Sequence, residues 1–161
     1  MKVLISSCVY GNKVRWNGSN KLHQEIVDWA DRVGLELVPV CPEDELFGTP
    51  RRPIRLASVE GRTVASMGSD DVYHLLVSKA QEIHSRHPDA VGFIGIAKSP
   101  SCGIAVGVRK LGTTIKAPMH AESEVPTVEI NQLKTSRDRS LFLDRVVRYF
   151  VEKSCRDLEK G

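Results

Sequence analysis

Four cysteines, Cys8, Cys41, Cys102 and Cys155, are the residues of this chain whose chemistry is most distinctive. They form no C-x-x-C pair and have no zinc-finger spacing. A free cysteine is commonly a small buried hydrophobic residue, so packing is the simplest reading of each one. Three of them, however, closely follow an apolar run, where a loop is more exposed than a strand centre. This pattern favours a shared site for Cys8, Cys41 and Cys102, with Cys155 elsewhere.

Two kinds of thiol chemistry are open to such a site. In the first, Cys8 is a nucleophile in a phosphate-binding loop that ends at Arg15, but the six residues between them are one more than a cysteine phosphatase loop has. In the second, the three thiolates hold a metal centre. A structural zinc site usually takes four ligands, whereas a 4Fe–4S cluster needs one ligand per iron. Three cysteines would leave one iron open to a substrate, which favours a catalytic cluster over an electron carrier.

The segments before these cysteines predict the strands that position them. Short apolar runs rich in β-branched residues predict strands over residues 2–6 and 36–40. Residues 91–96 are nearly all apolar and predict a strand buried on both faces. Residues 126–130 predict a last strand. The carboxyl ends of parallel strands share one edge of a sheet, so the three cysteines are expected to meet there.

Helical spacing of apolar residues predicts helices over residues 20–33 and 138–155, and a third that ends near residue 87. Ser69 is expected to cap this third helix, with two aspartates in its first turn. The segment 45–66 is rich in Gly, Pro and Arg, which predicts a loop with at most a short hairpin near residues 59–64.

Alternating strands and helices predict an α/β fold, a single-domain, Rossmann-like, mostly parallel sheet with helices on both faces. The 161 residues suit one domain, residues 1–161, and an apolar content of 41% with a net charge of +3 is ordinary for a globular protein. No apolar run reaches the roughly 20 residues of a membrane helix, and no signal-peptide cleavage site is recognisable, so a cytoplasmic protein is expected. The basic cluster at residues 51–55 lacks interleaved aromatics and is interpreted as a solvated loop.

Three motifs, taken together and in order, resemble the thiouracil desulfurase family, long catalogued as a bacterial domain of unknown function. They are Cys8 with Gly11 and the Val-Arg-Trp-Asn-Gly of residues 14–18, the Val-Pro-Val-Cys-Pro-Glu of residues 38–43, and the Lys-Ser-Pro-Ser-Cys-Gly of residues 98–103. The resemblance covers about residues 2–150. It implies non-redox removal of sulfur from thiolated pyrimidines, chiefly 4-thiouracil and its nucleoside or nucleotide forms. It also implies a 4Fe–4S cluster whose three ligands are, by motif match, Cys8, Cys41 and Cys102.

The same resemblance implies roles for polar residues. Glu43 matches the acid/base carboxylate of the family and Ser99 the first serine of its third motif, so both are expected to be catalytic. Ser101 and Arg15 are expected to bind substrate. The chemistry is sound, because iron can polarise a thiocarbonyl through its sulfur, and a nearby carboxylate can take a proton from the attacking water. The histidines have no ligand spacing and are expected on the surface, except His120, which could line the site.

Several alternatives stay open. Segments 44–47, 51–53 and 104–124 depart from the family pattern, which leaves the size of the substrate undecided. One alternative is a desulfidase that acts on 4-thiouridine in tRNA, the substrate implied for two-domain relatives. The modest charge and the chain length place tRNA below a free base or nucleotide. A non-catalytic iron–sulfur sensor and a zinc-binding module are alternatives from other classes.

Overall fold

The computed structural model describes residues 1–104, 106–107 and 114–160. The elements follow the chain in this order: β1 Lys2–Ser6, α1 Ser7–Tyr10, α2 Gln24–Arg32, β2 Glu36–Val40, α3 Pro42–Phe47, β3 Ile54–Val59, β4 Arg62–Met67, β5 Asp70–Asp71, α4 Tyr73–Arg86, β6 Ala90–Gly95, β7 Val106–Gly107, β8 Thr114–Ile115, α5 Pro118–Ala121, β9 Thr127–Glu129, a 3₁₀ turn Ile130–Gln132 and α6 Ser136–Lys160.

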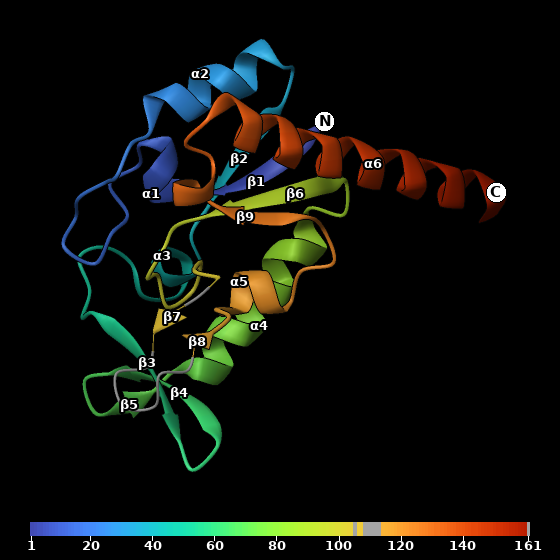
Figure 1. The fold of residues 1–161 in the computed structure, drawn as a ribbon. Coiled ribbons are helices and arrows are strands. Elements are labelled where there is room, and N and C mark those ends of the chain that lie inside the picture. The colour runs from blue at the N-terminus through green and yellow to red at the C-terminus, as the bar shows by residue number, and fades with distance from the viewer. Residues whose placement is uncertain (105, 108–113, 161) are drawn as a thin grey trace.

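A parallel sheet is the centre of the fold. Among the described residues it has four strands in the order β2-β1-β6-β9 (Figure 1). β1 lies between two partners, so that Ile5 is level with Pro39 of β2 and with Ile94 of β6. β9 extends the sheet beside β6. The predicted α/β fold with a mostly parallel sheet is confirmed.

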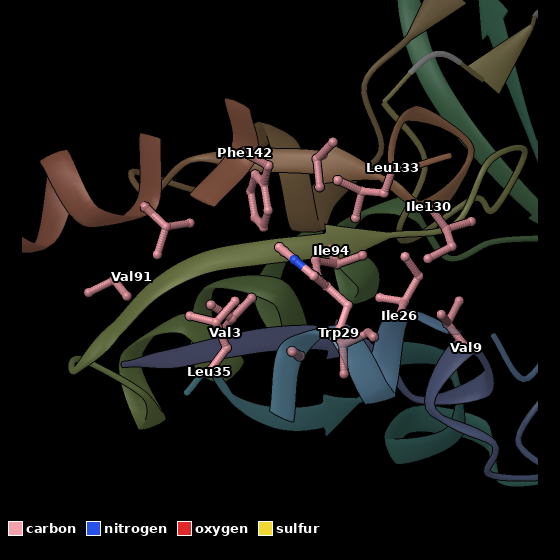
Figure 2. Close-up of a cluster of buried hydrophobic side chains, with 14 residues drawn as sticks. Val3, Val9, Ile26, Trp29, Leu35, Val91, Ile94, Ile130, Leu133 and Phe142 are labelled. Carbon is pink, nitrogen blue, oxygen red and sulfur yellow. The ribbon is translucent and has the colours of Figure 1, made fainter. Parts of the chain in front are cut away.

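Side chains alternate between the two faces of this sheet, and helices cover both faces. Val3 and Ile94 pack with α2 and α6 in one apolar cluster, which Figure 2 shows around Trp29 and Phe142. On the other face Phe93 packs with residues of α4 and α5. Full burial of one large apolar side chain contributes about 1.5–3 kcal/mol to the free energy of unfolding. Because β1 and β6 place such side chains in both clusters, they join the helices on the two faces of the sheet.

Two helices begin later in the chain than the sequence predicted. α2 starts at Gln24 rather than at residue 20, because the backbone N–H groups of Lys21 and His23 donate to the carbonyls of Cys8 and Val9 instead. Leu22, an apolar residue within the helix predicted over residues 20–33, therefore lies before α2 and is 47% exposed.

The predicted cap of α4 at Ser69 is also wrong. Asp70 and Asp71 form the short strand β5, which pairs with β4. The Asp71 carboxylate accepts from the N–H of Tyr73, 3.1 Å away, and also from the N–H of Ala65. The side chain that satisfies the helix start is therefore two residues further along than predicted, and α4 begins at Tyr73.

The segment 45–66 is more ordered than its composition indicated. α3 covers its first residues, and β3 and β4 form a hairpin with six residues in each strand. In Figure 1 this hairpin lies apart from the parallel sheet, below α3. The hairpin is stable because Ile54, Leu56 and Ala65 pack with Leu76 of α4. Of the atypical segment 104–124, residues 105 and 108–113 lie outside the described residues.

α6 is longer than predicted and runs to Lys160, with its far end extending past the sheet (Figure 1). Its buried face is formed by Phe142 and Val146. Among the described residues, none of the helices is both long enough and apolar enough to span a membrane.

Candidate active site

Three cysteines line one cavity at the carboxyl edge of the parallel sheet. Cys8 lies in α1, directly after β1, and Cys41 caps α3, directly after β2. Cys102 lies in the loop after β6. All three contribute to the wall of a cavity of about 310 Å³. Cys155 is exposed on α6 and does not contribute to this wall.

The three thiols are free and partly or fully buried. Cys102 is buried, and Cys8 and Cys41 are half-buried. Burial disfavours a thiolate, so it raises the pKa of Cys41 to about 12 and also raises the pKa of Cys8 and of Cys102. An activated nucleophilic cysteine has a lowered pKa, so these surroundings do not favour a nucleophilic Cys8. A bound metal ion deprotonates a coordinating thiol outright, so iron would add to the positive charge that Arg15 supplies at Cys8 and Arg51 at Cys41, which does not outweigh burial.

Glu43 is held in the cavity wall by hydrogen bonds at both carboxylate oxygens. It lies in the first turn of α3, where Pro42 suits the first helical position and acidic side chains suit the helix dipole. Ser101 Oγ donates to Oε1 over 2.7 Å, and Arg51 Nη2 donates to Oε2 over 3.1 Å. Glu43 is buried, and the two hydrogen bonds fix the orientation of its carboxylate.

Sequence reasoning missed Arg51. Its side chain is only 4% exposed, and it also donates from Nη1 to the Gly48 carbonyl and to Thr49 Oγ1. The prediction of a solvated loop over residues 51–55 is therefore wrong for Arg51; Arg52 is exposed in that loop, and Arg55 is exposed on strand β3. Local composition does not distinguish the three arginines. A buried arginine needs a partner, and only the fold shows that Glu43 is that partner.

The loop of residues 99–103 is shaped by its first serine. Ser99 Oγ accepts from the backbone N–H of Ser101 and, over 3.1 Å, from that of Cys102. The two serine hydroxyls are 3.3 Å apart. Both serines line the cavity, but the structure brings Ser101, rather than Ser99, into contact with Glu43.

Arg15 lies at the same cavity, beside Trp16 and Lys21. Its Nη1 is 3.3 Å from Ser19 Oγ, and its charge favours the thiolate of Cys8. The predicted site residues thus all line one cavity: Cys8, Arg15, Cys41, Glu43, Ser99, Ser101 and Cys102.

Two histidines differ from the expectation. His120 is buried but lies outside the wall of this cavity, with Nε2 2.8 Å from the Cys102 carbonyl. Burial lowers the pKa of His120 to about 4, so the ring is neutral near pH 7. His84, expected on the surface, is half-buried against α5, with Nε2 3.0 Å from the Met119 carbonyl.

A second cavity of about 570 Å³ adjoins the first and was not predicted. Lys21 and Lys98 line both cavities, and the second also has Lys134, Arg139 and Glu25 in its wall. Lysine and arginine outnumber the acidic side chain there, so this second cavity suits an anionic group.

The thiols also have to be considered as ligands of a single ion. Across residues 1–104, 106–107 and 114–160, no three His, Cys, Asp or Glu side chains lie close enough together to bind one metal ion. A 4Fe–4S cluster makes a different demand, because each cysteine binds its own iron.

Comparisons with known proteins place the chain in a family. The 2-thiouracil desulfurase family model matches residues 3–127, which include all three cavity cysteines and Glu43. The uncharacterised protein YbbK of Bacillus subtilis strain 168 is 30% identical over 111 residues, covering 63% of this chain and 72% of that protein. A solved structure of TudS, described as a 4Fe–4S-dependent thiouracil desulfidase, matches with a TM-score of 0.63 at 21% identity. The match covers 82% of this chain and 92% of that one, and it shows a shared fold. This chain belongs to the 2-thiouracil desulfurase family.

Proposed function

We propose that this protein is a desulfidase that removes sulfur from thiolated pyrimidines by hydrolysis, with a 4Fe–4S cluster held by Cys8, Cys41 and Cys102. The observation that carries the proposal is three free thiols in the wall of one cavity, next to a fixed carboxylate. Soft thiolates are the ligands that iron–sulfur clusters take, so the donor set fits. TudS, which shares this fold, is described as 4Fe–4S-dependent, and this supports the same cofactor. We assign the activity to the bacterial cytoplasm, where reducing conditions keep thiols free.

When bound, such a cluster supplies a Lewis-acidic iron for the sulfur of the substrate. Glu43 accepts a proton from the water that attacks the ring carbon, which is general-base catalysis. The Arg51 and Ser101 bonds orient the carboxylate for that proton while each oxygen keeps lone-pair capacity. Water supplies the new carbonyl oxygen and sulfur leaves as sulfide, so no electron is exchanged.

The remaining polar residues bind and orient the substrate. Ser101 contacts Glu43 directly and can exchange a proton with it. The Ser99 hydroxyl is 3.3 Å from the Ser101 hydroxyl. We therefore propose that Ser99 takes part in catalysis by exchanging a proton with Ser101 or by donating to the ring of the substrate. Arg15 at the same cavity supplies a positive charge for the ring oxygen or a phosphate.

The two adjoining cavities favour a small substrate that carries an anionic group. A pyrimidine ring in the cysteine-lined cavity would place a sugar phosphate near Lys21 and Lys98, which line both cavities. Lys134 and Arg139 extend the positive charge into the second cavity. We therefore favour a thiolated pyrimidine nucleotide over tRNA, which would need a longer basic surface to follow its backbone. A sensor or a zinc module would have no use for a carboxylate fixed in this position.

The test is anaerobic reconstitution with iron and sulfide, followed by an absorbance assay on three substrates in parallel. These are 4-thiouracil, 4-thiouridine monophosphate and thiolated tRNA. We expect iron and sulfide to bind and the monophosphate to be turned over. A loaded protein that acts on none of the three would support the sensor, and turnover of tRNA alone would support the RNA enzyme. A protein that binds zinc and cannot be loaded with iron would overturn the cluster.

A further inference from the structure

The short helix α5 and Ala117, the residue before it, bind three consecutive carbonyls around Cys102. Ala117 N–H donates to the Gly103 carbonyl over 2.9 Å, and Met119 N–H donates to the Ser101 carbonyl over 3.0 Å. The carbonyl between these two belongs to Cys102, and it accepts from His120 Nε2 over 2.8 Å. Because a carbonyl cannot donate, Nε2 must carry the proton in this bond.

The Cys102 carbonyl differs from its neighbours because its partner is a side chain. The outer two carbonyls are held by backbone N–H groups, which no substitution other than proline removes. The bond from His120 is buried, so a substitution that removes the donor leaves a buried carbonyl without a partner. The peptide between Cys102 and Gly103 would then be held only at its N–H, which donates to the Ser99 carbonyl over 3.0 Å, so the position of the Cys102 Sγ would be less firmly fixed.

The bond between His120 and Cys102 passes close to the backbone of β6 at Gly95. A Cβ at Gly95 would lie 2.0 Å from the Cys102 carbonyl oxygen and 2.4 Å from His120 Nε2. The last residue of β6 is therefore a glycine where the bond crosses the strand. The His120 ring also packs on Phe93 of the same strand, with centroids 4.8 Å apart.

We propose that His120 is a positioning residue that fixes the Cys102 peptide, and through it the Cys102 sulfur, for retention of an iron–sulfur cluster. The proposal builds on the function proposed above, because it takes Cys102 as a cluster ligand. His120 acts through the loop and not on the substrate, since it lies outside the wall of the cavity. When the Cys102 sulfur is less firmly positioned, its bond to iron would break more often. Each time it breaks, that iron would be exposed to a chelator.

The test compares two histidines, His120 and His84, each of which donates to a backbone carbonyl. The variants are His120→Leu, His120→Gln, which keeps an amide donor of similar reach, and His84→Leu as a matched control. His84 donates to the Met119 carbonyl of α5 in the same way, but that carbonyl is not on the Cys102 loop. The readouts are the rate of iron release to a chelator and the electron paramagnetic resonance spectrum of the reduced cluster.

We expect His120→Leu to release iron about tenfold faster than the parent, with an altered spectrum, and His120→Gln to restore both. His84→Leu should leave both unchanged, even where it lowers the unfolding temperature. Equal release rates for the two leucine variants would overturn the proposal, as would a glutamine variant that behaves like leucine.

A second measurement does not depend on a cluster. In the metal-free protein, alkylation of Cys102 followed by mass spectrometry should be about tenfold faster in His120→Leu than in His84→Leu. Should His120→Leu fail to fold, His120→Asn replaces it, because its shorter amide does not reach the Cys102 carbonyl: Cys102 should then react about tenfold faster in His120→Asn than in His120→Gln, and equal rates would overturn the positioning role. Equal reactivity of Cys102 in the leucine variants would overturn the positioning role. Failure of the parent to bind iron would refute the proposed function and leave this measurement intact.

Discussion

Replacement of Arg51 by methionine should destabilise the protein strongly, because it removes the cation from a buried ion pair. The side chains of Arg51 and Glu43 are only 4% and 10% exposed, and their charged atoms are 3.1 Å apart. Methionine fills much of the same space, so the main effect is a buried carboxylate that has lost its positive partner.

The size of the effect follows from this burial. Removal of one partner of a buried pair typically costs 3–5 kcal/mol. Two further bonds from Arg51, to the Gly48 carbonyl and Thr49 Oγ1, are lost as well. In the other direction, Arg51 Nε is a buried donor without a partner among the described residues, and its removal relieves about 1–3 kcal/mol. We therefore expect a net loss of about 3 kcal/mol in the free energy of unfolding.

Urea denaturation of the metal-free protein under reducing conditions measures this loss. A 3 kcal/mol change should also lower the midpoint of thermal unfolding by roughly 6–12 °C in a chain of this length. Arg52→Met is the matched control, because Arg52 is exposed and should change the stability by less than about 0.5 kcal/mol. Glu43→Gln combined with Arg51→Met should recover part of the loss, since the unpaired charge is then gone.

A loss for Arg51→Met no larger than that for Arg52→Met would refute the buried pair. Additive losses in the double variant would also contradict the reasoning, because two residues that share one interaction must show a coupling energy.

Three further predictions concern the chemistry, the substrate and the pH dependence. Glu43→Gln keeps the size of the side chain but removes the proton acceptor, so turnover should fall by about 10²–10⁴-fold while the cluster spectrum stays normal; near-parental turnover would remove Glu43 from the mechanism. Turnover of a thiolated nucleotide should change little between 50 and 200 mM salt, whereas a steep loss of affinity would indicate many phosphate contacts and an RNA substrate. Burial lowers the pKa of His84, with an opposing contribution from Glu122 and an additional lowering by His87. The unfolded chain therefore takes up this proton first as the pH falls below about 6.5, and the stability of the metal-free protein should decrease there by more than that of His84→Gln; equal slopes in urea denaturation would contradict this.

The position of the site could be predicted from the sequence, because strand periodicity fixes where each strand ends. Cys8 and Cys41 each follow an apolar run directly, and parallel strands bring such positions to one edge. Glu43 follows two residues after Cys41, so the same argument places it near the thiols. These inferences need only local pattern and one rule of topology.

Contacts between distant loops could not be predicted in this way. Arg51 and Arg52 are adjacent and alike in the sequence, yet one is buried against Glu43 and the other is exposed. The sequence around His120 has no metal-ligand spacing, and its partner is the Cys102 carbonyl, 18 residues away in the chain. No local pattern predicts such a contact. The predicted start of α4 was wrong because it also depended on a contact with another segment. Asp70 and Asp71 pair with β4, and this pairing replaces the helix cap that Ser69 would form.

The central claim is that Cys8, Cys41 and Cys102 together hold an iron–sulfur cluster, and iron loading of alanine variants tests it most directly. Each variant is reconstituted anaerobically with iron and sulfide, and both elements are then measured per protein chain. We predict that replacement of any one of the three abolishes stable loading, while Cys155→Ala loads like the parent because that side chain is exposed on α6. Equal loss of iron in Cys155→Ala, or full loading after replacement of one of the three cavity cysteines, would contradict the account.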